Sequence, residues 1–159
     1  MQVEPASISP DHIRLFNAYH ADMTDRREWP EHQVIADEYF QSFLAGHWEF
    51  AYEFRYFRGD KLVGLGLVDV LPEALSSVYF FHDPSWRSDG PGTFSIQKEI
   101  EFAKNHGIDH VYLGYWIEAC PSMTYKARFG PHEVLDDYVE DTDQPSWNLP
   151  VIQAPSGQN

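Results

Sequence analysis

Residues 76 to 117 restrict the fold more than any other stretch of the sequence, because they contain a strand, a helix and a second strand in that order. The run Ser76–Phe81 (SSVYFF) has the aromatic and branched side chains typical of a strand. A glycine-rich loop follows, and Thr93–His106 carries apolar residues at helical spacing before Gly107 ends the helix. Asp109–Ile117 is again apolar and aromatic. A strand–helix–strand crossover of this kind brings its two strands together in parallel within one sheet.

The residues that precede the crossover predict two helices and an antiparallel pair of strands. Ser9 and Pro10 are the cap and first-turn residues of a helix start. A polar loop over Asp22–Glu31 separates this helix from a second one, which ends at Gly46. The elements predicted outside the crossover are a helix from Pro10, a helix over 34–44, strands over 48–57 and 62–71 joined by a turn at 58–61, a short helix over 121–127 and a strand over 133–139.

This order of elements predicts an α+β fold in which helices cover both faces of a mixed sheet. The order is similar to that of the GNAT acyltransferase fold. We expect a single domain over residues 1–140 and an extended acidic, proline-containing tail over 141–159.

Composition excludes several classes of protein. No apolar run approaches the roughly 20 residues of a membrane helix, and no signal peptide opens the sequence, so we expect a cytoplasmic protein without a membrane partner. Cys120 is the only cysteine, which excludes a cysteine-based metal cage, and the 8 histidines show no metal-ligand spacing. The net charge of −14 weighs against broad contact with RNA, because phosphate contacts usually need a basic surface.

Three successive runs carry a resemblance to a known family. They are SSVYFFHDP, GTFSIQKEIEFAKNHGI and VYLGYWIEACPSMTYKARFGPHE. In this order they resemble the C-terminal domain of arginyl/leucyl-tRNA–protein transferases, which include the bacterial aspartate/glutamate leucyltransferases. The likeness covers residues 10–135, and its last run is long and unusual, which makes it specific.

The resemblance implies a GNAT-like enzyme that moves Arg or Leu from an aminoacyl-tRNA to the N-terminal α-amine of a protein beginning with Asp or Glu, an N-degron modification. It implies the 3′ end of the tRNA as the donor, and no tightly bound cofactor or metal. Proteins of this family carry an N-terminal domain with clustered cysteines ahead of this one. We therefore expect either a separate subunit in place of that domain or a different donor or acceptor.

Aminoacyl transfer needs a base for the amine and groups that stabilise the oxyanion. Asp69, on the strand facing SSVYFF, and Glu118, just after the last crossover strand, are the candidate bases, and a solvated carboxylate is the alternative for each. Tyr79 and Tyr115 are expected on the two strands that flank the crossover helix. A hydroxyl there would donate to the oxyanion or to the terminal adenosine of the tRNA, unless these are core tyrosines.

The segment Tyr125–Phe129 places two cations among aromatic residues. Tyr125, Lys126 and Arg128 are therefore the candidate substrate-binding residues. The ligand of the two cations would be the acidic side chain of the acceptor or a phosphate of the donor, and an internal ion pair is the alternative.

The loop before the crossover helix supports a second hypothesis. Arg87, Gly90, Gly92 and Thr93 have the form of the phosphate cradle of acetyl-CoA-dependent GNAT enzymes, in which backbone N–H groups at a helix start bind pyrophosphate. The alternative function is therefore an acyl-CoA-dependent N-acyltransferase. A third alternative is a non-catalytic module that binds protein N-termini or regulates a partner.

Overall fold

A computed structural model describes residues 1–120, 122–140 and 142–149 of the chain. The chain divides into two compact units, Met1–Tyr115 and Trp116–Asn159. The single domain over residues 1–140 stays a prediction. No described helix combines the length and the apolar character that crossing a bilayer requires.

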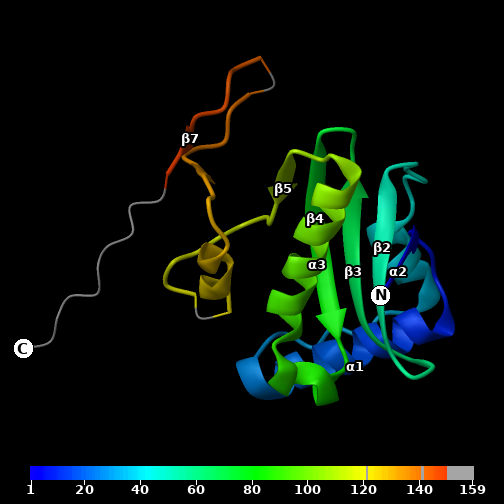
Figure 1. The fold of residues 1–159 in the computed structure, drawn as a ribbon. Coiled ribbons are helices and arrows are strands. Elements are labelled where there is room, and N and C mark those ends of the chain that lie inside the picture. Colours follow the sequence, from blue (N-terminus) through cyan, green and yellow to red (C-terminus); the bar gives the residue numbers. More distant parts are fainter. Residues whose placement is uncertain (121, 141, 150–159) are drawn as a thin grey trace, which may run out of the picture. The chain divides into compact units, whose positions relative to one another are not determined.

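The first unit is built on a five-stranded sheet with strands in sequence order, β1 to β5 (Figure 1). Strands β1 to β4 are antiparallel neighbours, and β4 pairs with β5 in parallel, as the crossover predicted. The elements are β1 (Gln2–Pro5), α1 (Pro10–Arg27), α2 (Ala36–Phe43), β2 (Ala51–Arg58), β3 (Lys61–Val70), β4 (Ala74–His82), the 3-10 helix η1 (Pro84–Asp89), α3 (Pro91–His106) and β5 (His110–Tyr112).

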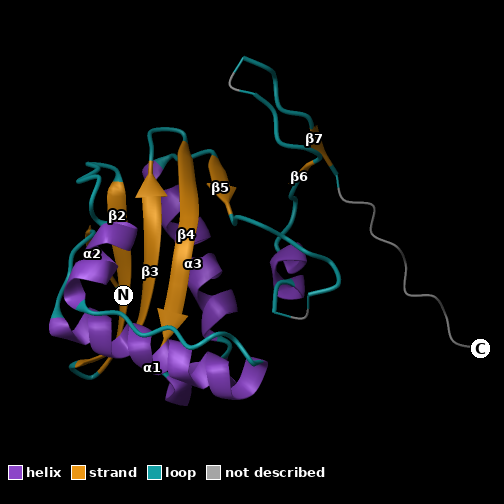
Figure 2. Ribbon diagram, turned by 180° about the vertical axis from the view of Figure 1, so that it is seen from behind, coloured by secondary structure: helices purple, strands orange, loops and turns teal. Residues whose placement is uncertain are grey.

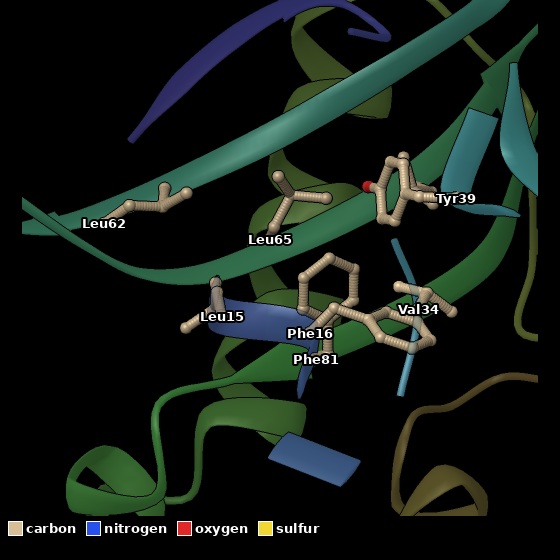
Figure 3. Close-up of a cluster of buried hydrophobic side chains, with 8 residues drawn as sticks. Leu15, Phe16, Val34, Tyr39, Leu62, Leu65 and Phe81 are labelled. Atoms are coloured by element: carbon tan, nitrogen blue, oxygen red, sulfur yellow. The ribbon is translucent and has the colours of Figure 1, made fainter. Parts of the chain in front are cut away.

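Helices cover both faces of this sheet, which confirms the predicted α+β architecture. Figure 1 shows α3 on the face toward the reader, and Figure 2, seen from behind, shows α1 and α2 on the opposite face. Each face buries its own apolar cluster. The cluster under α1 and α2 includes Leu15, Phe16, Leu65 and Phe81 (Figure 3). The cluster under α3 includes Phe54, Tyr56, Val68, Leu75 and Ala103.

Helix α1 begins where the sequence predicts and runs further than predicted. The Ser9 side chain caps it by accepting a hydrogen bond from the backbone N–H of His12. The loop predicted from Asp22 was wrong as far as Arg27, because Arg26 donates to the Asp22 carboxylate one turn earlier at 2.9 Å. The helix ends at Glu28, whose φ of 57° is left-handed.

Strand β5 is shorter than the predicted strand over 109–117. It ends at Tyr112, and Gly114 has a φ of 71°, a conformation that glycine adopts without strain and that breaks an extended strand. Tyr115 therefore lies beyond the strand, contrary to the prediction, and 80% of its surface is exposed.

The second unit contains little regular structure among its described residues. Its elements are the 3-10 helix η2 (Thr124–Arg128) and the antiparallel pair β6 (Val134–Leu135) and β7 (Trp147–Asn148). The short helix predicted over 121–127 is thus a 3-10 helix that starts later, and the strand predicted over 133–139 spans two residues. Residues 121, 141 and 150–159, which include most of the predicted tail, lie outside the described residues.

Candidate active site

Strand β4 loses its parallel partner halfway along its length. Only Ala74–Ser76 pairs with β5, whereas β4 itself continues to His82. Within the described sheet, residues 77–82 of β4 have no strand partner on the β5 side. An open strand edge offers backbone N–H and C=O groups in a row, so an extended ligand can bind here.

A β-bulge lies directly after the last parallel pair. Leu67 is opposite Tyr79 and Val68 is opposite Ser77, so Val78 is the extra residue of β4. A bulge takes backbone groups out of the regular ladder and turns them toward a new direction. The side chain of Val78 is half exposed. The bulge therefore presents backbone groups where the edge of β4 becomes open.

A small hollow of about 170 Å³ lies beside the bulge. Its described lining is mostly apolar, with one carboxyl group and one serine hydroxyl: Ala6, Ser42, Phe43, Trp48, Ala51, Tyr52, Leu67, Val68, Asp69 and Val78. Burial raises the pKa of Asp69 above its ordinary value of 3.8. A carboxyl group with a raised pKa in an apolar hollow is suited to exchange a proton with a substrate.

The exposed indole of Trp48 forms part of the wall of this hollow. It packs parallel to the ring of Phe50, with ring centroids 5.6 Å apart. On its other side it lies against Gly46, where any Cβ would collide with the indole ring. Glycine at this position therefore allows the flat side chain to lie on the backbone.

Tyr79 lies on the α1 face of the sheet, next in sequence to the bulge. Its hydroxyl is 3.0 Å from Nε2 of His20 on α1. Burial, and secondarily the neighbouring Tyr19, raises the pKa of Tyr79 to about 12. Its ring also stacks against Phe43, 5.9 Å away, and Phe43 lines the hollow that contains Asp69. Tyr79 and Asp69 thus belong to one continuous face of the sheet.

The residues of the predicted phosphate cradle lie at the end of η1 and the start of α3. Gly90 has a φ of 66° and joins the end of η1 to the first turn of α3, where Gly92 and Thr93 lie. The guanidinium of Arg87 is paired with Asp22 of α1, and Asp89 accepts from Arg58 at 3.0 Å. The backbone N–H groups of the helix start, rather than Arg87, are thus the groups suited to bind an anion.

The remaining predicted site residues lie in the second unit. Glu118 is exposed, and Tyr125, Lys126 and Arg128 lie on or next to one turn of the 3-10 helix η2. In the described residues, no group of three or more His, Cys, Asp or Glu side chains is arranged to hold a metal.

Sequence reasoning missed three features of the site. The bulge at Val78 depends on register with β3, which no local pattern reveals. Trp48 lies in a turn rather than in the strand predicted from it. His20 follows Phe16 by one helical turn, so helical spacing placed it on the buried side of α1, which was the available signal.

The fourth strand of this mixed sheet is bulged and separates from the fifth, and a glycine-containing loop and a helix follow the fourth strand in sequence. These features define a protein with the GNAT acyltransferase fold. Solved structures agree on the fold. A possible acetyltransferase from Clostridium difficile is similar with a TM-score of 0.63 at 12% identity, covering 87% of this chain and 95% of that chain. An aminoglycoside acetyltransferase from an uncultured soil sample, in complex with sisomicin, has a TM-score of 0.59 at 18% identity and the same coverage.

The chain belongs to the arginine-tRNA-protein transferase family, because residues 11–136 match its C-terminal region. An aspartate/glutamate leucyltransferase of Helicobacter hepaticus is 37% identical over 147 residues, which is 92% of this chain and 61% of that protein. The enzyme of the same name from Campylobacter jejuni is 35% identical, over 81% of this chain and 54% of that protein. The chain thus spans little more than half the length of these relatives.

Proposed function

We propose that this chain transfers an amino acid, Leu or Arg, from an aminoacyl-tRNA to the N-terminal α-amine of a protein that begins with Asp or Glu. Family membership supports this function, together with the name that the relatives carry. The observation that carries the proposal is the position of the Asp69 hollow. It places a carboxyl group of raised pKa beside the bulge and the open edge of β4.

The reaction joins the α-amine to the ester carbon and releases the tRNA hydroxyl. An α-amine has a pKa of about 8, so only modest help is needed to remove its proton. Asp69 is proposed to accept this proton as the amine attacks. The bulge at Val78 is proposed to direct a backbone N–H toward the oxyanion, whose stabilisation is usually the largest contribution to catalysis. Because the Tyr79 hydroxyl is held by His20, we propose that it contacts the acceptor.

The donor is the 3′ end of an aminoacyl-tRNA. We propose that its terminal nucleotide follows the open edge of β4, with a phosphate at the backbone N–H groups of Gly92 and Thr93. Tyr125, Lys126 and Arg128 are proposed to bind further phosphates, and the two cations lie between Tyr125 and Phe129 in sequence. Tyr115 and Glu118 remain proposed substrate-binding and catalytic residues. Aminoacyl-tRNA is a cytoplasmic molecule, which is why we place the reaction in the cytoplasm.

A separate subunit is proposed as a partner.

A transfer assay tests the function. The protein is mixed with labelled leucyl- or arginyl-tRNA and a peptide that begins with Asp, and label in the peptide is measured. A peptide with an acetylated N-terminus must remain unlabelled. A parallel reaction uses acetyl-CoA as the donor. Acetylation of the peptide without aminoacyl transfer would establish the acyl-CoA-dependent function instead. No transfer from any donor would contradict both functions.

The Asp69→Asn variant tests the role of the hollow. Loss of a general base typically lowers the rate by about a hundredfold or more, so we expect at least that loss of kcat. Asp60→Asn is the matched control, because Asp60 is an exposed carboxylate in the turn between β2 and β3. Equal rates for the Asp69→Asn variant and the native protein would remove Asp69 from the mechanism.

A further inference from the structure

Two histidines lie side by side on the α1 face of the sheet, next to Tyr79. His20 projects from α1 and is buried, whereas His32, in the connection between α1 and α2, is exposed. Their ring centroids are 5.0 Å apart. His20 also stacks on Phe16 at 4.2 Å and lies 6.0 Å from the ring of Trp29. These rings form an aromatic and imidazole surface that opens to solvent at His32.

No carboxylate partners this imidazole pair within the described residues. The only hydrogen bond to His20 there is that of the Tyr79 hydroxyl, and His32 has no hydrogen bond or ion pair. Asp22, the acid nearest to His20 in sequence, is already bound by Arg26 and Arg87, and Glu31, next to His32, is exposed and makes no ion pair with it in the described structure. The pair is therefore a potential cation in an otherwise acidic protein, and an anion that binds it would displace no other anion.

The electrostatics of the pair favour an anionic ligand. Burial lowers the pKa of His20, and the neighbouring His32 lowers it further, because a positive charge on His32 opposes protonation of His20. A carboxylate bound beside the pair would attract a proton to His20 and so oppose both effects. Binding of such a ligand would therefore be coupled to uptake of a proton.

We propose that His20, His32 and Tyr79 form the subsite for the acidic side chain of the acceptor's first residue. This inference rests on the proposed function. The carboxylate accepts hydrogen bonds from an N–H of His32 and the O–H of Tyr79. His20 takes up a proton at Nε2 and donates it in a hydrogen bond to the Tyr79 oxygen. Tyr79 packs against Phe43, which lines the hollow of Asp69, so the subsite and the hollow lie on the same face of the sheet.

Other titratable groups around the pair do not compete for this role. Burial disfavours the ionised form of Asp22, but hydrogen bonds from Arg26 and Arg87 outweigh it and keep the Asp22 pKa low. Tyr19, from α1, contacts both His20 and His82, and burial lowers the pKa of His82 at the end of β4. The charged neighbours are thus two arginines already bound to one carboxylate, which leaves the imidazoles to respond to a ligand.

Peptide binding tests the subsite without requiring turnover. Four peptides that differ only in the first residue (Asp, Glu, Asn or Gln) are titrated into the full chain by calorimetry. At about pH 6 we expect the acidic peptides to bind about tenfold more tightly than their amides, and at about pH 8 we expect that preference to be lost. Near neutral pH, the binding enthalpy of the acidic peptides should vary with the ionisation enthalpy of the buffer, as proton uptake requires.

Variants assign the effect to the imidazole pair. His32→Gln alters an exposed side chain, and it should abolish the preference for acidic peptides while the Asn peptide still binds. Tyr79→Phe should reduce the preference. His106→Gln, an exposed histidine on α3, is the control and should behave as the native protein.

The proposal is overturned if acidic and amide peptides bind equally, if His32→Gln keeps the preference, or if no peptide binds. The transfer assay distinguishes failure of the proposed subsite from failure of the proposed function. A His32→Gln variant that still transfers leucine to the Asp peptide with unchanged kcat and KM would leave the function standing and remove the subsite.

Discussion

Glu53 has no exposed surface, although it carries a charge in the middle of β2. Its carboxylate accepts hydrogen bonds from the backbone N–H and hydroxyl of Ser7 and from the guanidinium of Arg55, and Nε2 of His12 is 3.1 Å away. Burial favours the neutral acid, but the hydrogen bonds and charges of His12 and Arg55 outweigh it and hold the pKa of Glu53 below 4.5. The network fastens the start of α1 to the sheet.

This network predicts how stability depends on pH. A carboxyl group whose pKa is depressed by folding contributes stability above its unfolded pKa, and that contribution is lost as pH falls through the folded pKa. Glu53→Gln should remove the contribution, flatten the pH dependence below about pH 5 and cost about 3 kcal/mol at neutral pH. Urea unfolding at several pH values measures both effects.

Glu4→Gln is the matched control for the Glu53 prediction. Glu4 lies opposite Glu53 in the register of β1 and β2, but its side chain is exposed. Its substitution should leave both the stability and its pH dependence nearly unchanged. A steep acid transition that survives in Glu53→Gln would show that other carboxylates control acid unfolding.

At the scale of the elements, two buried glycines of β3 have different neighbours. A Cβ added to Gly64 would collide with the ring of Trp86, which packs between the sheet and α3, whereas a Cβ added to Gly66 would meet its nearest atom, the Ser95 hydroxyl, at 3.5 Å. Neither neighbour can be identified from the sequence alone, because both come from segments distant from β3. Gly64 is thus needed for η1 and α3 to pack closely against β3.

The two glycines provide a matched pair of variants. Gly64→Ala overpacks the site and should lower the free energy of unfolding by about 1–3 kcal/mol. Gly66→Ala places its methyl group at ordinary contact distance and should cost less than about 1 kcal/mol or stabilise the strand. Chemical denaturation compares the stabilities of the two variants, and near-ultraviolet circular dichroism reports on the packing of the aromatic side chains, Trp86 among them. Equal destabilisation by both substitutions would contradict the assigned role of Trp86.

The sequence predicted those elements whose own residues determine them. Helix α3 and the strands β2 to β4 have strong periodicity and clear ends, such as Gly107, so their order and the parallel pair followed directly. Strand β1 was missed because four residues with one half-buried side chain carry too little pattern. The bulge at Val78 and the contact of His20 with Tyr79 arise from register and packing between distant segments, which no single stretch of sequence encodes.

Candidate residues divide in the same way. Asp69 and Tyr79 were placed by their strands and lie on one face of the sheet. Tyr115 was assigned to a strand that Gly114 ends early. Two further residues near these candidates are His32, in the connection of α1 to α2, and Trp48, in the turn before β2. Hydrophobic periodicity gives no information about the position of residues in such connections.

At the scale of the whole molecule, net charge limits how the chain could bind the proposed tRNA donor. It has 11 Lys and Arg against 25 Asp and Glu. Most described cations of the first unit are bound to carboxylates: Arg14, Arg26, Arg55, Arg58, Lys61, Arg87 and Lys98. The segment η2 (TYKAR) holds Lys126 and Arg128 within one short 3-10 helix. Because most described cations of the first unit are already bound, affinity for the proposed tRNA donor should depend on a few local contacts rather than on a broad basic surface.

The salt dependence of tRNA binding distinguishes local contacts from net charge. For single-stranded nucleic acid, each phosphate contact contributes about 0.7 to the slope of log affinity against log salt concentration. The double variant Lys126→Gln/Arg128→Gln should therefore weaken binding of a leucyl-tRNA and reduce the slope by about 1.4. The double variant Arg14→Gln/Lys98→Gln changes the net charge equally, but it alters α1 and α3, where no phosphate contact is proposed for these two side chains. If both variants change the slope to the same extent, the tRNA responds only to net charge, and η2 makes no phosphate contact.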